Sequence, residues 1–306
     1  PSPFQGPSRS MCSLRGRGEV NPIGLAVCGS HGKTTTTAML ATVFRDAGLD
    51  PTAVVGSSVL QWSGNALSGH GPHVIIEADE YQNKFQYYNP KAIILTSIDW
   101  DHPDFFPTAE SYQNVFDDFI ARLPKDGLIV ACRDDKNVVK AIKAAPCKVI
   151  TYSIDEEFKE VELPEEVPLL NIRHLKVKIL NYQMFHVYLG NQDLGAFSLQ
   201  LPGLHNVQNA LGVIAMAWHY KIPLDIIRKS LAAFQGTKRR LEYKGKKSGI
   251  IVYDDYAHTP KEIQATLAAL RPIHPKAYVI AVFQPHTYSR TKQFLSEFAQ
   301  SFSQAD

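Results

Sequence analysis

The chain has 306 residues, of which 44% are hydrophobic and 20% charged, a composition typical of a globular protein with about two domains. Its 32 Lys and Arg residues against 30 Asp and Glu leave a net charge of +2, which gives no reason to expect bulk attraction to nucleic acid or to a membrane. No apolar run approaches the roughly 18 residues that span a bilayer, and four cysteines without metal-ligand spacing predict reduced thiols in a cytoplasmic protein.

Residues 1–21 are rich in Pro, Gly and Ser, lack the apolar core of a secretory signal and predict a tail or linker. From residue 22 onward, apolar runs alternate with helical periodicity, which indicates an α/β fold with a mostly parallel sheet and flanking helices. Ligands bind at the carboxyl ends of the strands in such sheets. The predicted strands are 23–28, 74–76, 92–97, 128–131 and 148–152, and the predicted helices are 35–47, 111–122 and 136–144.

The pattern changes near residue 170, where alternating apolar residues predict antiparallel hairpins on the flank of the sheet. After Gly236 the alternation of strands and helices resumes, which predicts a second, Rossmann-like α/β domain. We therefore expect a central domain at 22–236 and a partial C-terminal domain at 237–306, cut short after Asp306. The predicted segments are hairpin strands at 175–179 and 184–188, helices at 206–220, 223–234, 260–270 and 291–302, and strands at 249–253 and 278–283.

A glycine-rich turn joins the first predicted strand to the first helix. Its glycines let backbone N–H groups face a phosphate, Lys33 supplies charge to the outer phosphates, and the Thr34 hydroxyl can bind magnesium. The usual phosphate-loop pattern has its first glycine at the position of Val27, so this loop is shortened. The alternative is a chance glycine-rich turn. The predicted strand before the loop, the helix after it and Gly-Lys-Thr at the junction argue against that alternative. The predicted phosphate-binding residues are Gly29, Ser30, His31, Gly32, Lys33, Thr34 and Thr35.

Acidic clusters follow two of the predicted strands. Glu77 begins the first cluster, and a carboxylate near a phosphate loop suits magnesium, which prefers oxygen ligands. A solvated acidic loop is the alternative, and the phosphate loop upstream favours the metal role. His102 lies between aspartates after the next strand. A lone histidine is more often structural, so its residue type leaves the role of His102 open.

Further polar residues suggest the rest of a nucleotide site. Asn206 and Asn209 share a face of a predicted helix, where their amides can read the donors and acceptors of adenine, although helix capping by Asn206 explains one of them equally well. Arg240 lies in a basic run at the proposed domain junction and could reach a γ-phosphate, unless the run is a solvated linker. Asp255 follows a strand, where a carboxylate could bind ribose.

Two motifs in the last third of the chain suggest a second substrate. Tyr256 and His258 lie between a strand and a helix, and His286 and Arg290 repeat that placement after the next strand. A guanidinium binds a carboxylate in bidentate fashion, so Arg290 is a candidate clamp for a substrate carboxylate.

Taken together and in order, these motifs resemble the Mur ligases of peptidoglycan synthesis. The resemblance runs from about residue 22 to the end, and the combination is far more specific than any one motif. The motifs are Gly29-Ser30-His31-Gly32-Lys33-Thr34, Asp101-His102, His205-Asn206 with Asn209, Lys238-Arg239-Arg240, Asp255-Tyr256-Ala257-His258-Thr259-Pro260 and Phe283-Gln284-Pro285-His286.

The resemblance implies an ATP- and Mg²⁺-dependent ligase that activates a carboxylate as an acyl phosphate and joins it to an amine. It implies that Lys33, His102 and Arg240 act in catalysis, that Thr34, Glu77 and His102 bind magnesium, and that Asn206, Asn209, Arg240 and Asp255 complete the nucleotide site. Tyr256, His258, His286 and Arg290 look like the pocket for the incoming amino acid.

Within the family, the loop histidine, the basic run and the Phe-Gln-Pro-His stretch look most like the branch that adds L-alanine to UDP-N-acetylmuramate. The resemblance implies no nucleic-acid or membrane partner and leaves the oligomeric state open. The alternatives are a murein peptide ligase, a folylpolyglutamate-synthase-like ligase, a generic small-molecule kinase and a non-catalytic nucleotide-binding remnant. Residues 1–20 match nothing in the family, and we expect its N-terminal UDP-binding domain to be absent here. Thr287 replaces an arginine of some relatives, which would leave Arg290 as the sole carboxylate clamp.

Overall fold

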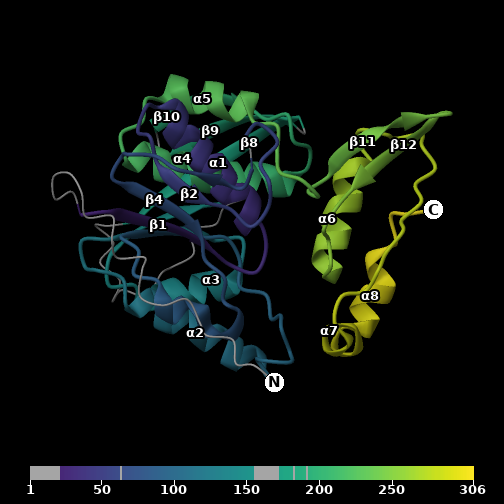
Figure 1. Cartoon of the computed structure of the whole chain (residues 1–306), viewed down its shortest axis with the longest axis horizontal. Helices are drawn as coiled ribbons and strands as arrows, with labels where there is room; N and C mark the ends of the chain where they lie inside the picture. The colour runs from purple at the N-terminus through teal and green to yellow at the C-terminus, as the bar shows by residue number, and fades with distance from the viewer. Residues whose placement is uncertain (1–20, 63, 155–171, 182, 191) are drawn as a thin grey trace.

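A computed structural model of the chain describes residues 21–62, 64–154, 172–181, 183–190 and 192–306 (Figure 1). A large body contains one sheet with helices on both faces, and a smaller C-terminal body lies beside it in Figure 1. None of the helices in these ranges is long and apolar enough to cross a membrane.

The sheet of the large body has ten strands in the order β10-β9-β8-β7-β6-β5-β1-β4-β2-β3. Neighbours from β8 through β2 pair in parallel, whereas β3, β9 and β10 pair antiparallel. The mostly parallel sheet and its antiparallel flank are therefore confirmed. The strands are β1 Ile23–Cys28, β2 Thr52–Val54, β3 Ala66–Leu67, β4 His73–Glu77, β5 Ala92–Leu95, β6 Leu128–Cys132, β7 Lys148–Tyr152, β8 Ile172–Asn181, β9 Met184–Leu189 and β10 Gln192–Ser198.

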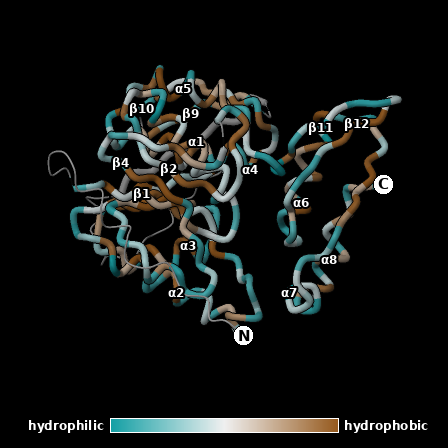
Figure 2. The backbone as a smooth tube through the Cα atoms, viewed as in Figure 1, coloured by the Kyte–Doolittle hydropathy of each residue, from teal (hydrophilic) through white to brown (hydrophobic). Residues whose placement is uncertain are grey.

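Helices cover both faces of the sheet, which explains why its central strands are apolar along their whole length. Leu25 and Val27 of β1 pack into the core on one face, and Ala26 and Cys28 pack into the core on the other. Figure 2 shows the most hydrophobic backbone running through these strands. The helical segments are α1 Lys33–Asp46, η1 Tyr81–Tyr87, α2 Ala109–Ala121, α3 Lys136–Ala141, η2 Ile142–Ala144, α4 Leu204–His219 and α5 Leu224–Ala233.

The C-terminal body is small and has a small core, in which Ile263 and Leu267 pack against Phe298. Its longest helix begins at a capping box, where Thr259 and Glu262 exchange hydrogen bonds, with Pro260 in the first turn. Its elements are β11 Glu242–Lys247, β12 Ile250–Asp254, α6 Pro260–Leu270, α7 Tyr288–Gln293 and α8 Leu295–Ser301.

Two predictions for the C-terminal body are wrong. The predicted strand at 278–283 runs outside any ladder of the described residues, and Val282 is 96% exposed. The apolar run alone was therefore not enough to predict a β-strand, because a strand also needs a neighbouring strand with which to pair. In the described part of 237–306, β11 and β12 pair antiparallel. The predicted helix at 291–302 is divided at Phe294 into α7 and α8.

Candidate active site

The glycine-rich loop leaves β1 and is fixed against the end of β5. The N–H of Ser30 donates to the carbonyl of Ser97 at 2.9 Å, and the N–H of His31 donates to the Ser97 hydroxyl at 3.0 Å. Gly29 has a φ of 131°, and a Cβ there would lie 2.1 Å from Thr96 Oγ1. Gly32 has a φ of 77° and packs against Asn209 of α4. Both glycines are therefore required by conformation and by close packing.

Lys33 begins α1 and points back across the loop. Its Nζ donates to the carbonyl of Gly29 at 2.5 Å and to Glu80 Oε2 at 2.8 Å. Burial lowers the pKa of Lys33, but the carboxylates of Glu80, Glu77 and Asp79 outweigh it and raise that pKa above its ordinary value. The carboxylates around Lys33 therefore favour its charged ammonium form, at the position that the motif predicts.

Glu80 holds this lysine and is only 1% exposed. Its other oxygen, Oε1, accepts a hydrogen bond from the Tyr112 hydroxyl at 2.9 Å. Tyr112 also contacts the Ser30 hydroxyl at 2.8 Å, which links α2 to the loop. Nothing in the sequence pattern marked Tyr112, whereas Glu80 lay in the acidic cluster from which Glu77 was chosen.

Thr34 and Glu77 meet at the mouth of the loop, as predicted for magnesium ligands. The Thr34 hydroxyl donates to Glu77 Oε1 at 2.9 Å, and the N–H of Gly56 donates to Glu77 Oε2 at 2.7 Å. The described residues hold no group of three or more His, Cys, Asp or Glu suited to a metal. Mg²⁺ at phosphate sites takes only one or two carboxylates and completes its shell with phosphate and water. One hydroxyl and one carboxylate beside a phosphate loop therefore fit Mg²⁺.

His102 lines the same cavity of about 380 Å³ as Lys33, Thr34 and Glu77. Its backbone has a φ of 54°, which is uncommon for a residue with a side chain. Its Nε2 lies 3.7 Å from Asp101 Oδ2 and 4.0 Å from Glu80 Oε1. The structure thus places His102 in one cavity with Lys33, with carboxylates as neighbours. We call it the phosphate-end cavity, after the role that the sequence predicts for the loop.

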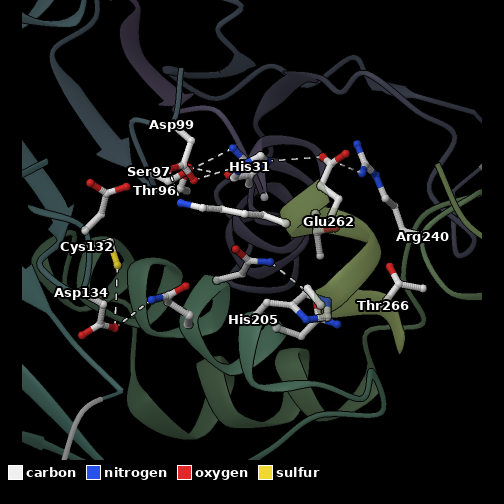
Figure 3. Close-up of a pocket in the computed structure, with 18 of the residues that line it drawn as sticks. His31, Thr96, Ser97, Asp99, Cys132, Asp134, His205, Arg240, Glu262 and Thr266 are labelled. Atoms are coloured by element: carbon white, nitrogen blue, oxygen red, sulfur yellow. Dashed lines mark hydrogen bonds and ion pairs between the residues drawn. The ribbon is translucent and has the colours of Figure 1, made fainter. Parts of the chain in front are cut away.

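A second cavity of about 530 Å³ adjoins the loop on the side of α4 (Figure 3). Asn206 and Asn209 both line it, together with His31 and Gly32 of the loop. Asn206 is not the N-cap of α4, because that position is Gly203 and no side chain caps it. The capping alternative is therefore wrong, and both amides belong to one cavity wall. Unpredicted lining residues include Asp134, Asn137, Gln208 and Lys261.

Residues of the C-terminal body close the opposite wall of this cavity. Asp255 accepts hydrogen bonds from the N–H groups of Leu241 and Ala257, both at 2.7 Å, so its carboxylate has a fixed orientation. Arg240 lines both cavities, and its guanidinium lies 5.5 Å from the ring centroid of Tyr256. Arg240 is thus a predicted site residue of the C-terminal body that connects the two cavities.

Tyr256 and His258 line the phosphate-end cavity, with their ring centroids 4.9 Å apart. His286 lies behind them, 6.0 Å from His258 between ring centroids. The structure therefore places these three residues, all predicted for the incoming substrate, next to one another. Burial lowers the pKa of His258, which favours its neutral form.

Arg290, the fourth of these residues, is 2% exposed and pairs with a carboxylate of the protein itself. Its Nε and Nη2 donate to the two oxygens of Asp101 at 2.7 and 3.1 Å. Its Nη1 donates to the carbonyl of His286 at 3.2 Å. In this arrangement the predicted substrate clamp is occupied, and it joins the C-terminal body to the loop that carries His102.

Replacing Arg290 with Met is expected to lower the free energy of unfolding strongly, because it leaves the carboxylate of Asp101 buried without its partner. Loss of one member of a buried pair costs about 3–5 kcal/mol, and urea unfolding measures it. Lys292→Met is the matched control, because Lys292 is exposed two residues further on. Equal stability of the two variants would contradict the role of the pair.

Glu262 is the most consequential residue that the sequence reading missed. It lines both cavities and approaches the side chains of His31, Arg240 and His258. The spacing Thr259-x-x-Glu262 is a capping-box signature, which could have marked the position. Its contacts with residues far away in the sequence have no local signal.

Comparisons with known proteins agree with this geometry. Residues 27–217 match the Mur ligase middle domain, and residues 239–306 match the Mur ligase, glutamate ligase domain. The UDP-N-acetylmuramate–L-alanine ligase of Caldanaerobacter subterraneus subsp. tengcongensis is 38% identical over 287 residues, which cover 92% of this chain and 59% of that protein. The corresponding ligase of Salinibacter ruber is 40% identical over 283 residues, which cover 92% of this chain and 57% of that protein.

Solved structures give the same picture. The UDP-N-acetylmuramate–alanine ligase of Thermotoga maritima superimposes with a TM-score of 0.73 at 26% identity, covering 93% of this chain and 60% of that one. A murein peptide ligase of Psychrobacter arcticus gives a TM-score of 0.69 at 25% identity, covering 94% of this chain and 62% of that one. The chain thus spans about three fifths of the length of these relatives.

Proposed function

Because the chain belongs to the Mur ligase family, we propose that it carries the ATP-dependent step that joins L-alanine to UDP-N-acetylmuramate in the cytoplasm. One observation carries the proposal: the phosphate loop lies between two cavities, both of which the C-terminal body closes. One cavity has the two amides. The other has Lys33, Glu77 and His102. A ligase of this kind needs the nucleotide on one side of the transferred phosphoryl group and the carboxylate that accepts it on the other.

The residues of the loop hold the triphosphate. Backbone N–H groups and Lys33 bind the outer phosphates, while Asn206 and Asn209 contact adenine and Asp255 contacts ribose. Magnesium, held by Thr34 and Glu77 with His102 as a further ligand, would neutralise charge on the phosphates. Arg240 reaches the γ-phosphate from the C-terminal body.

The reaction has two steps in this site. A carboxylate oxygen of the sugar nucleotide attacks the γ-phosphorus, and ADP leaves. The amino group of L-alanine then attacks the acyl carbon of the acyl phosphate, and phosphate leaves as the amide bond forms. The protein contributes mainly positioning and charge stabilisation around the transferred phosphoryl group.

We propose that His258 accepts the proton that the amine loses. Its Nδ1 lies 2.9 Å from the carbonyl of Tyr256, an acceptor that fixes the proton on that nitrogen. Its Nε2 then remains an acceptor, and the lowered pKa of His258 keeps the ring neutral at pH 7.

We also place the boundary between the two domains at residues 236 and 237, with residues 1–21 outside the central domain. The matched regions support this division, because the first ends at 217 and the second begins at 239. Gly236 has a φ of 99°, where a residue with a side chain would be strained.

The proposal predicts that ADP and phosphate form only when UDP-N-acetylmuramate and L-alanine are both present with Mg·ATP. Mass spectrometry of the sugar nucleotide should show the addition of one alanine. Turnover with a tripeptide but not with L-alanine would instead identify a murein peptide ligase. Nucleotide binding without phosphate release under either condition would support the non-catalytic alternative and contradict the proposal.

A further inference from the structure

A chain of side chains with alternating charge crosses the junction between the phosphate loop and the C-terminal body. Lys261 pairs with Asp99, and His31 Nε2 lies 3.1 Å from Asp99 Oδ2. On the other side, His31 Nδ1 lies 3.6 Å from Glu262 Oε1, which lies 3.8 Å from Arg240 Nη1. Figure 3 shows the row from Asp99 through His31 and Glu262 to Arg240. We call these five residues the junction chain.

The two oxygens of Glu262 have separate tasks. Oε2 accepts hydrogen bonds from the N–H groups of His258 and Thr259, at 2.9 and 3.2 Å, and so caps α6. Oε1 faces His31 of the loop and Arg240 of the segment before β11. Helix capping accounts for one oxygen only, and the other joins three separate parts of the chain.

The charges of the junction chain support one another. Burial would lower the pKa of His31, but Asp99 and Glu262 raise it to about 9. Burial would raise the pKa of Glu262, but His31, His258 and Arg240 lower it below its ordinary value. His31 is therefore an imidazolium at neutral pH, and Nδ1 has no hydrogen-bond partner among the described residues. The charge of Glu262 is what compensates this buried N–H.

We infer that Glu262 is a positioning residue that seats the C-terminal body on the phosphate loop through His31 and thereby aims Arg240 at the phosphates. Arg240 and Glu262 line both cavities and form an ion pair at 3.8 Å, so Glu262 helps to hold the Arg240 guanidinium at the junction. The catalytic consequence rests on the proposed function, whereas the seating itself does not. Asp99 and Lys261 complete the seating from the other side of the imidazole.

Two substitutions separate positioning from capping. Glu262→Gln keeps an oxygen for the capping box, in which glutamine is as acceptable as glutamate, but removes the charge. Glu262→Ala removes both. Glu297→Gln is the control, because Glu297 is exposed in the first turn of α8 and lies in neither cavity.

The first measurement is the pKa of His31, which an NMR titration of the histidine rings in the 306-residue chain determines. We expect a value of about 9 in the unaltered chain and in Glu297→Gln. In Glu262→Gln it should fall by at least about one unit, because one of two compensating carboxylates is lost. This readout needs no turnover, so it tests the seating even if the proposed function fails.

The second measurement separates kcat from the KM for ATP. In Glu262→Gln we expect kcat to fall roughly tenfold, with a smaller change in KM. A tenfold effect corresponds to the coupling energy typical of residues in one ion-pair network. An unchanged pKa of His31 in Glu262→Gln would overturn the inference. Full activity of Glu262→Gln together with loss of activity in Glu262→Ala would also overturn the inference. Helix capping alone would then account for the role of Glu262.

Discussion

Replacing Lys33 with methionine is expected to lower ATP turnover by roughly 10²–10³-fold, as for the loss of one preorganised group that stabilises transition-state charge. The Nζ lies within the loop and is held by Gly29 and Glu80, so little reorganisation is needed when phosphate arrives. Steady-state measurement of ADP release in the presence of both other substrates tests this. A loss of less than threefold would contradict the role of Lys33.

The same substitution also leaves Glu80 buried without its cation, so part of its effect could be structural. A matched double variant separates the two effects. Removal of one partner of a buried pair costs about 3–5 kcal/mol, and Lys33→Met with Glu80→Gln removes the uncompensated charge. We expect the double variant to recover most of the lost free energy of unfolding in urea, yet to remain inactive. Recovery of turnover together with stability would show that Lys33 acts only through folding.

Gly29→Ala is the second substitution with a large expected effect. Its φ of 131° is disfavoured for alanine, and the new Cβ would lie 2.1 Å from Thr96 Oγ1 and 2.8 Å from the backbone nitrogen of Ser97. Backbone strain and overpacking each cost about 1–3 kcal/mol, so we expect a loss of roughly 3 kcal/mol or more. The loop must then move away from β5, and nucleotide binding should be lost with it.

Gly64→Ala provides the control for Gly29→Ala. A Cβ at Gly64 would have no heavy atom within 4 Å, and its φ lies outside the strained positive range. Urea unfolding and calorimetric titration with Mg·ATP should therefore leave this variant close to the unaltered chain. Wild-type nucleotide affinity in Gly29→Ala would show that the loop does not need its observed conformation.

The large body was predictable because its signals are local. Strands β1 and β5 are apolar on both faces, since helices cover both faces of the sheet, and the loop between β1 and α1 carries its motif in consecutive residues. The C-terminal body was less predictable. The segment 278–283 has the apolar pattern of a strand, but pairing depends on a partner elsewhere in the chain.

The same distinction applies to the site. Lys33 and Thr34 are adjacent in the sequence, so one motif reveals both. Asp101 and Arg290 are 189 residues apart, and no sequence signal near either residue predicts that they pair. Glu262 has a local capping signature, but its second task depends on His31, which approaches it only in the folded chain. Sequence reasoning thus identified residues that line the two cavities better than the residues that hold them in place.

The central claim is that one nucleotide lies across the phosphate loop, with adenine beside the two amides and phosphates at Lys33. A crystal structure of the chain with Mg²⁺ and a non-hydrolysable ATP analogue tests it most directly. We expect the adenine beside Asn206 and Asn209, the phosphates on the N–H groups of residues 29–34, and Mg²⁺ in contact with Thr34. Nucleotide bound elsewhere, or an empty loop at saturating analogue, would contradict the account.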